Sequence, residues 1–372
     1  MKALSTWQIY SLMLLFQMGT NVVFGFAGTA KQDAWIVAFL STLGAFLLQW
    51  LYYKLYATRP GENWTSLLKL SFGRYLGTFL HTVYIVVFLY LAARNLRDLG
   101  EVTKVQLLFN TPPIVDMMIF QLLVAYICYA GIQRMGRLAE LNMPIIFLFI
   151  VLQIILISFS GIMDFSRLMP VAENWNLIAT TVFPFSISVP YSETFVFSMF
   201  GALTVAPRAY KKAAMLSVAS AGLIFTIWDI LSVSTLGSTI FSRSFFPLMT
   251  TFQMINIADF ITNIDPVIVT NYMITLMIKI AVYALATCAG IARLCKLDSY
   301  KSIIMPVSLL VIVLAYFMTD NLSSHLFVAI NWTGWLILLP LFIVLPAIVL
   351  VIMTVKNRRT GEGRKLHEPT TN

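Results

Sequence analysis

The sequence predicts an all-α integral membrane protein of ten transmembrane helices, arranged as a 5+5 inverted repeat in which helices 1 and 6 are broken. Three observations support this prediction. The 372 residues are 59% apolar and only 11% charged, and their mean hydropathy of +0.84 lies far above the range of soluble domains. Ten apolar segments are long enough to cross a bilayer. Glycine or proline interrupts the first and the sixth of them.

The ten spans follow from runs of about 20 mostly apolar residues, the length that crosses the roughly 30 Å hydrocarbon core of a bilayer. They cover residues 7–28, 34–56, 76–98, 113–131, 143–163, 177–203, 213–239, 267–291, 303–319 and 332–354. We expect one membrane domain over 1–355, with repeat 1 at about 7–163 and repeat 2 at about 177–354, followed by a basic tail over 356–372.

The distribution of basic residues predicts the orientation of the spans. If the N-terminus is inside, 18 of the 25 lysines and arginines fall in cytoplasmic segments and six fall outside. Such an excess is typical of cytoplasmic loops, so we expect both termini in the cytoplasm and contact with the lipid bilayer along the whole domain. Because the basic residues are dispersed over short loops and the tail, we expect no nucleic-acid partner.

The first span has an alternative interpretation as a secretory signal peptide. Lys2 precedes it, and Gly28-Thr29-Ala30 is similar to a cleavage site of small residues. The apolar run is longer than a signal-peptide core, however, and it contains Asn21. We therefore favour a retained first helix.

Residues 240–266 form the longest predicted loop. Met254, Ile257, Ala258 and Ile261 recur in it at helical spacing. This pattern predicts a short amphipathic helix lying at the outer membrane surface.

Three side chains of span 3 are candidates for an internal or interfacial position. Arg94 lies near the predicted outer end, so we expect its long side chain to reach the lipid headgroups. Tyr84 and Tyr90 could face a cavity, although membrane aromatic residues more often pack or lie at the interface.

Small and polar residues interrupt the first span. Gly19, Thr20 and Asn21 follow one another in its middle, and Gly25 comes one turn later. Glycine alone would be explained by close helix packing. The adjacent threonine and asparagine favour a broken helix whose backbone groups face a ligand.

The sixth span is interrupted by Pro184 and Pro190, with Ser186 and Ser188 between them. Each proline removes a helical donor, and the freed carbonyl groups need partners inside protein or at a water-filled cavity. A packing kink would explain the prolines, but not Glu193 three residues later. That carboxylate could stabilise the N-terminal end of the outgoing half-helix or bind a ligand or ion, and both roles remain open.

Both interruptions fall in the first helix of a five-helix half. In inverted-repeat transporters the ends of two such half-helices meet near the midplane of the membrane, where they offer donors to a carboxylate and acceptors to an ammonium group. The predicted ligand is therefore a zwitterionic amino acid.

Polar side chains recur every four residues on the eighth span, at Thr275, Lys279, Tyr283 and Thr287, and so share one face. Lys279 lies too deep to reach either interface and needs an internal partner, either Asp229 or Glu193. A purely structural ion pair would also explain a lysine at this position. So would a misplaced span boundary, which would leave Lys279 in water. The sharper hypothesis is that its ammonium replaces a bound sodium ion and makes the protein sodium-independent.

Two motifs resemble those of the spore germination permease family, the B-subunits of germinant receptors in endospore-forming bacteria. They are AKQDAWI at residues 30–36, after the interrupted first span, and FPF followed by YSETFVFSM at residues 183–199. The resemblance covers essentially the whole chain, although Ser192 stands where the family would have glycine.

The resemblance implies the LeuT/APC-type fold of the amino acid, polyamine and organocation transporters. It also implies residence in the spore inner membrane, assembly with an A-subunit and a lipoprotein C-subunit, and sensing of a nutrient such as an amino acid. Asp33 and Trp35 of the first motif are expected to shape an outer turn. The candidate ligand-binding residues come from spans 1, 3, 6 and 8. They are Gly19, Thr20, Asn21, Gly25, Tyr84, Ser186, Ser188, Tyr191, Ser192, Thr275 and Thr287. The candidate coupling or structural charges are Glu193, Asp229 and Lys279.

Three functions are compatible with a ligand-binding pocket between the broken helices. The leading hypothesis is a ligand-sensing receptor subunit, in which the ligand favours one conformer. The second is an amino acid transporter, proton-coupled through Glu193, Asp229 or Lys279. The third is an ion pathway opened by the ligand, for which the sequence contains no selectivity-filter signature.

We expect neither catalysis nor a cofactor or metal. The sequence lacks HExxH and GxSxG motifs, and its three cysteines, Cys128, Cys288 and Cys295, lack metal-ligand spacing. The three histidines fall near span ends or in the tail, at His81, His325 and His367. We expect His81 and His325 to be polar residues near the interface.

Overall fold

A computed structural model describes residues 3–25, 27–108, 110–201, 203, 207–254 and 265–359, and the statements below concern these residues. The described chain is helical, with no β-strand. Its elements are α1 (Thr6–Met18), η1 (Gly19–Val22), η2 (Gly28–Asp33), α2 (Ala34–Thr58), α3 (Trp64–Gln106), α4 (Pro113–Ala130), α5 (Ile132–Phe159), η3 (Phe165–Leu168), α6 (Trp175–Thr181), η4 (Val182–Ser186), η5 (Ser192–Phe200), α7 (Pro207–Arg243), α8 (Pro247–Gln253), α9 (Asp265–Leu294), η6 (Tyr300–Ile303), α10 (Ile304–Phe317), α11 (Leu322–Val328), η7 (Ala329–Val344) and α12 (Leu345–Arg359).

Long apolar helices dominate the structure. In the described part of the chain, 8 segments are long and apolar enough to cross a membrane: Gly28–Thr58, Trp64–Gln106, Pro113–Ala130, Ile132–Phe159, Pro207–Arg243, Val267–Leu294, Tyr300–Phe317 and Leu322–Arg358. The two remaining predicted spans, the first and the sixth, consist of short helical pieces joined by irregular backbone. The chain is therefore a multi-pass, all-α membrane protein, and its broken spans are the two that the sequence predicts.

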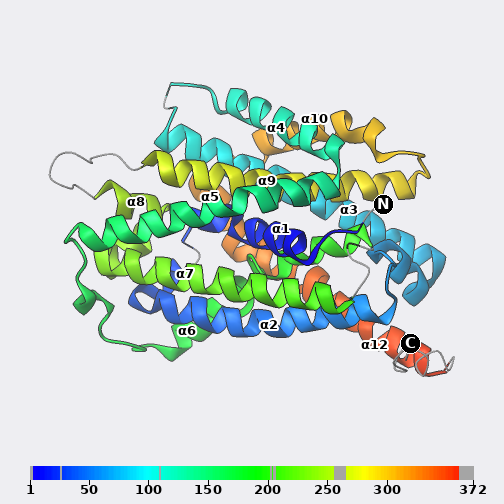
Figure 1. The fold of residues 1–372 in the computed structure, drawn as a ribbon, viewed down its shortest axis with the longest axis horizontal. Coiled ribbons are helices and arrows are strands. Elements are labelled where there is room, and N and C mark those ends of the chain that lie inside the picture. The colour runs from blue at the N-terminus through cyan, green and yellow to red at the C-terminus, as the bar shows by residue number, and fades with distance from the viewer. Residues whose placement is uncertain are drawn as a thin grey trace.

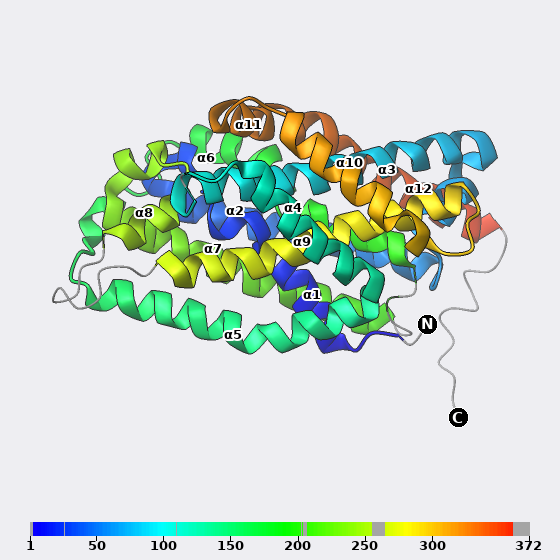
Figure 2. The same cartoon turned by 90° about the horizontal axis from the view of Figure 1, so that it is seen from above.

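The helices pair across the two predicted repeats. α2 packs against α7, α3 against α9 and α4 against α10, so the second, third and fourth helices of one half each contact their counterparts in the other. α1 lies at the centre, in contact with α5, α7 and α9 (Figure 1). α1 begins and α12 ends at the same end of the bundle, which Figure 2 shows from a second direction. An even number of spans requires this arrangement.

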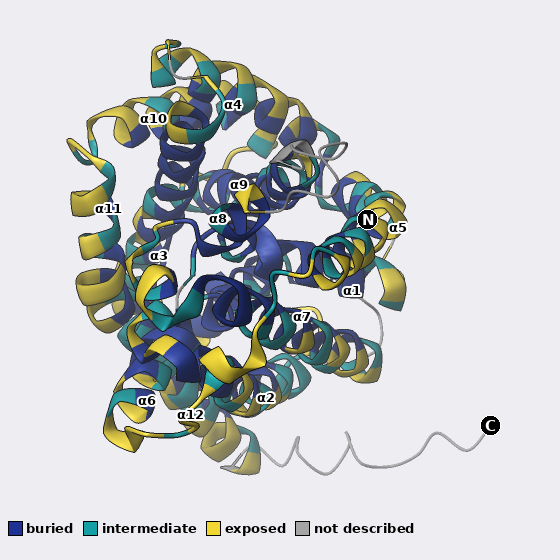
Figure 3. Ribbon diagram, turned by 90° about the vertical axis from the view of Figure 1, so that its left-hand side faces the viewer, coloured by how far each residue is buried: buried dark blue, intermediate teal, exposed yellow. Residues whose placement is uncertain are grey.

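The burial pattern separates central helices from peripheral ones (Figure 3). Of the eight unbroken spans in the described part of the chain, α9 is the most enclosed, with 78% of its most apolar stretch buried, against 28% for the corresponding stretch of α5. The outer faces of α4, α5 and α10 expose large apolar side chains such as Ile119, Leu148 and Leu309. These faces suit a lipid environment, in which exposed apolar surface carries no penalty.

Several boundaries differ from the prediction. α3 begins at Trp64 and bends at Gly73, whose φ of 81° is accessible to glycine without strain. It then continues to Gln106, two turns beyond the predicted end. α7 extends to Arg243, and α8 occupies the start of the predicted outer loop. The amphipathic segment predicted around Ile257, Ala258 and Ile261, and the tail beyond residue 359, lie outside the described residues.

The first family-like motif forms η2 and the start of α2. The Asp33 carboxylate accepts a hydrogen bond of 2.7 Å from the backbone amide of Ala172. The Gln32 amide donates to the Glu173 carboxylate at 3.0 Å. Because Ala172 adopts a φ of 58°, these bonds hold a strained turn of the 160–174 loop against α2. The expected turn-shaping role of Asp33 is consistent with this contact.

Candidate functional site

The first helix begins and ends at identifiable signals. Ser5 and Gln8 exchange side-chain to backbone hydrogen bonds of 3.1 Å each and so form a capping box at the start of α1. α1 ends where Gly19 leaves helical geometry, with φ 12° and ψ −110°. A β-carbon at this position would overlap the Lys279 side chain. Glycine at position 19 therefore lets α9 approach the break in helix 1.

Lys279 forms a buried ion pair with Glu193. Its Nζ lies 2.6 Å from Glu193 Oε2, and the side chains are 1% and 6% exposed. Lys279 also donates to Thr20 Oγ1 at 3.2 Å and lies 5.6 Å from the ring centroid of Phe16. The partner that the sequence left open is thus Glu193, and the pair connects broken helix 1, broken helix 6 and α9.

A polar cavity, here called the α3 cavity, adjoins this ion pair. Its volume is about 20 Å³. Its lining includes Thr20, Arg94, Asn95, Asp98, Glu193 and Lys279. The α3 cavity thus combines both signs of charge in a small buried space.

The α3 cavity continues into a buried polar network on α3 and α11. His325 Nε2 lies 2.8 Å from Asp98 Oδ1, with side-chain exposures of 0% and 7%. Arg94 donates to the His325 carbonyl at 3.4 Å. The prediction that Arg94 reaches the headgroups is wrong, because α3 extends three turns beyond it and Arg94 is buried. His325 is likewise buried instead of lying at the interface.

His81 also differs from its prediction as a residue near the interface. It is fully buried, with Nε2 lying 3.1 Å from the Gly290 carbonyl and Nδ1 lying 3.2 Å from Thr65 Oγ1. Both ring nitrogens therefore have partners, and the imidazole joins α3 to α9.

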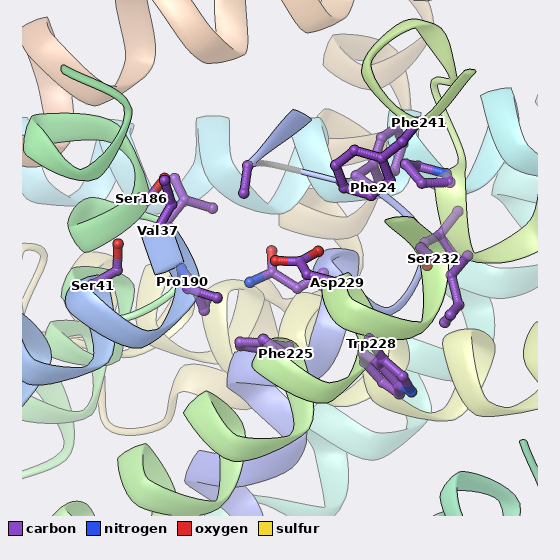
Figure 4. Close-up of a pocket in the computed structure, with 18 of the residues that line it drawn as sticks. Phe24, Val37, Ser41, Ser186, Pro190, Phe225, Trp228, Asp229, Ser232 and Phe241 are labelled. Atoms are coloured by element: carbon purple, nitrogen blue, oxygen red, sulfur yellow. The ribbon is translucent and has the colours of Figure 1, made fainter. Parts of the chain in front are cut away.

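A second cavity, here called the α7 cavity, lies between the first break, α2, η4 and α7 (Figure 4). Its volume is about 60 Å³. Its lining includes Asn21, Gly25, Ser41, Ser186, Tyr191 and Asp229. Phe24 and Val189 line both cavities and so separate them.

Comparison with known proteins decides the family. A family model described as "Spore germination protein" matches residues 3–323. The chain belongs to this spore germination protein family. It is 27% identical to Spore germination protein KB of Bacillus subtilis (strain 168) over 362 residues, 97% of each chain. It is also 30% identical to Spore germination protein YndE of the same strain over 143 residues, 38% of this chain and 39% of that one.

A solved structure supports the fold independently. The chain matches Mhp1, a nucleobase-cation-symport-1 family transporter captured in a closed conformation with bromovinylhydantoin bound. The TM-score is 0.64 at 15% identity, and the match covers 88% of this chain and 75% of Mhp1. This member of the spore germination family therefore has the transporter fold with broken helices 1 and 6.

The structure divides the predicted site residues among three environments. Asn21, Gly25, Ser186, Tyr191 and Asp229 line the α7 cavity. Thr20, Glu193 and Lys279 line the α3 cavity. The residues that line neither are Gly19, Tyr84, Ser188, Ser192, Thr275 and Thr287.

The residues outside both cavities are bonded mostly to backbone. The Tyr84 hydroxyl donates to the Leu341 carbonyl. Ser192 donates to the Ser188 carbonyl at 2.8 Å, and Thr287 to the Tyr283 carbonyl at 3.0 Å. Thr275 donates to the Asn271 carbonyl at 2.9 Å. The predicted polar face of α9 is fully buried, but only Lys279 brings it to a cavity.

The sequence predicts Tyr84 as the ligand-binding residue of α3, but it did not identify Asn95 and Asp98. Arg94, Asn95 and Asp98 line the α3 cavity, and Arg97 pairs with Glu101 at 2.5 Å. The signal was present in the sequence, because pairs spaced by four residues share a helix face. Arg94 with Asp98, and Arg97 with Glu101, are two such pairs. Their position at the end of an apolar span indicates a helix that continues in a buried environment.

Proposed function

We propose that this chain is the membrane subunit of a spore germination receptor, and that it binds an amino acid in the α3 cavity. Family membership and the relative named Spore germination protein KB support the receptor assignment. The observation that carries the site assignment is the set of charges lining the α3 cavity, where Arg94 and Lys279 face Glu193 and Asp98. A zwitterionic amino acid needs side chains of both charges, because its carboxylate is negative and its ammonium group is positive.

Unpaired polar atoms support an amino acid as the ligand. Among the described residues, Arg94 Nη1 and Asn95 Oδ1 are buried without a hydrogen-bond partner. A buried polar group without a partner costs about 1–3 kcal/mol. An α-carboxylate can accept from Arg94, and an α-ammonium group can donate to Asn95, so an amino acid would remove both penalties at once.

The Lys279–Glu193 pair supports sodium-independent binding. The methylene chain of Lys279 lies against Gly19, and its ammonium group donates to Thr20 at the break in helix 1. A fixed positive charge there would supply what a bound sodium ion supplies in transporters of this fold. We propose that Lys279 takes this role and that its contact with Glu193 keeps both broken helices in register.

The wider receptor assignment includes location and partners. We propose that the chain resides in the spore inner membrane with both termini in the cytoplasm. We further propose that it assembles with an A-subunit and a lipoprotein C-subunit, as the family resemblance implies, and that it is not an enzyme. The two ends of the described chain lie at the same end of the bundle (Figure 1), which is compatible with this orientation.

An amino acid transporter is the second candidate function. The fold match with a transporter favours it, and so does the buried Lys279–Glu193 pair, because intramembrane ionisable pairs often carry coupling protons. Both candidates use the α3 cavity, so only flux across a membrane separates them.

The test is binding and uptake of a panel of radiolabelled amino acids by the full-length protein in sealed liposomes, with and without a proton gradient. A receptor predicts saturable binding without accumulation. Arg94→Met should weaken that binding by at least about tenfold, because a buried charged contact is worth about 2–5 kcal/mol. Exposed Lys301 supplies the control, since Lys301→Met should leave binding unchanged.

Gradient-driven accumulation that Glu193→Gln abolishes would identify a transporter and overturn the receptor assignment. Absence of binding for every amino acid, with Arg94→Met indistinguishable from the parent, would overturn the α3 cavity as the site.

A further inference from the structure

The α7 cavity differs from the α3 cavity in its charge. Among the described residues that line it, Asp229 is the single acid, and lysine, arginine and histidine are absent. Asp229 makes no ion pair with the described residues. Figure 4 shows its carboxylate in the middle of the lining, between Ser41 and Ser186 on one side and Phe24 and Phe241 on the other. The cavity therefore has a negative centre without a counter-charge.

Polar atoms without partners also belong to the lining of the α7 cavity. The hydroxyl groups of Ser41 and Ser186 are buried and have no hydrogen-bond partner among the described residues, and neither has Asn21 Oδ1. Ser41 is 1% exposed and Ser186 is 7% exposed. Three separate elements, α2, η4 and the break in helix 1, thus present oxygen atoms to the space that Asp229 faces. An ammonium group donates three hydrogen bonds and matches such a set of acceptors.

The walls of the cavity favour an organic cation over a bare metal ion. The cavity is lined by four aromatic side chains, Phe24, Phe225, Trp228 and Phe241. On α7, Phe225 lies one turn before Asp229, and Trp228 lies directly before it. Aromatic faces attract cations, and the attraction strengthens where water is excluded. The cavity volume of about 60 Å³ is also several times the roughly 10–15 Å³ that holds one water molecule, which leaves room for a short apolar chain beside the ammonium group.

We propose that the α7 cavity is a second ligand site, which binds a small organic amine as its ammonium ion with Asp229 as the counter-ion. This site goes beyond the amino acid site of the α3 cavity. It lacks a cationic side chain for a carboxylate, so it selects amines against amino acids. A charged carboxylate inside a membrane domain is costly without a partner, and the bound ammonium supplies that partner.

The test uses propylammonium as the probe. Saturation binding of radiolabelled propylamine to the full-length protein in nanodiscs of neutral lipid should reach one molecule per chain. Asp229→Asn should weaken binding by at least about tenfold, since it removes the acid that pairs with the ammonium group. Asp98→Asn removes an acid from the α3 cavity instead and should change propylamine affinity by less than about twofold.

Ser41→Ala guards against a folding artefact of the Asp229 variant. Its hydroxyl has no partner to lose within the described structure, so the variant should fold normally and bind propylammonium several-fold more weakly. Equal propylamine affinity in the parent and Asp229→Asn would overturn the proposal. Displacement of bound propylammonium by an equal concentration of potassium ions would assign an alkali-cation site and would also overturn it. Failure of amino acid binding to the α3 cavity would leave this result unaffected.

Discussion

The buried Lys279–Glu193 pair predicts a strong energetic coupling between broken helix 6 and α9. The perturbations are Lys279→Met, Glu193→Gln and the double variant, in full-length protein. Lys279→Met leaves the Glu193 carboxylate buried without its partner. Glu193→Gln leaves the Lys279 ammonium group buried beside an uncharged amide. Because the two side chains are 1% and 6% exposed, solvent screening offers little compensation.

The magnitude follows from the geometry. At the observed separation of 2.6 Å and an effective dielectric constant of about 20, two unit charges attract by about 6 kcal/mol. Desolvation offsets much of this attraction, and removal of one partner of a buried pair costs about 3–5 kcal/mol. The double variant removes both charges, so we expect it to be more stable than the sum of the single effects by at least about 3 kcal/mol.

The assay is reversible SDS unfolding in bicelles, monitored by circular dichroism, with the free energy of unfolding taken from each transition. Exposed Lys301 provides the matched control, and Lys301→Met should change stability by less than about 0.5 kcal/mol. If the double variant equals the sum of the singles within about 0.5 kcal/mol, the pair makes no net contribution. The proposal that the Lys279–Glu193 pair joins broken helix 1, broken helix 6 and α9 would then fail.

Three further predictions concern positions outside this pair. Gly25→Ala should destabilise the protein by about 1–3 kcal/mol, because its β-carbon would lie 2.5 Å from Pro247 Cγ; Gly28→Ala, with its nearest neighbour at 3.9 Å, is the matched control in thermal unfolding. Asp33→Ala should increase proteolysis of the 160–174 loop, since the bond to Ala172 is worth about 1.5–3 kcal/mol; Asp33→Asn, which keeps an acceptor oxygen, should have the smaller effect, and equal cleavage of both variants and the parent would contradict it. Asp98→Ala should lower the unfolding free energy by about 1–3 kcal/mol by leaving His325 Nε2 without its partner, whereas Asp98→Asn retains an acceptor; identical losses in the two variants would argue against the hydrogen bond.

The broken helices could be predicted because their causes are local. Gly19 leaves helical geometry with φ 12° and ψ −110°, and Phe183, directly before Pro184, adopts extended geometry with φ −117° and ψ 132°. Proline and glycine signal such breaks in any context. The spacing of four on α9 likewise predicted a buried face correctly, because helical periodicity is a property of the chain alone.

The division into two cavities could not be predicted in the same way. Ser186 and Glu193 belong to one interrupted span, yet they line different cavities. Which side of the break a residue faces depends on the irregular backbone between η4 and η5, and no periodicity describes that segment. The contribution of Ser41 and Trp228 was missed for a related reason, because single serines and tryptophans are common in membrane helices and become informative only when helices converge.

If an amino acid binds in the α3 cavity as proposed, the ion pair would connect ligand binding to the contact between helices 1 and 6. Lys279 contacts Gly19 and Thr20 of helix 1 and pairs with Glu193 of helix 6. An amino acid bound through Arg94 and Asn95 would place its carboxylate and ammonium groups in the same cavity as these charges and would compete with the contact between them. Ligand binding shifts a conformational equilibrium only when the ligand interacts differently with the two states. A ligand that offers new partners to Lys279 and Glu193 meets this requirement, because it stabilises a conformer in which helices 1 and 6 no longer need each other.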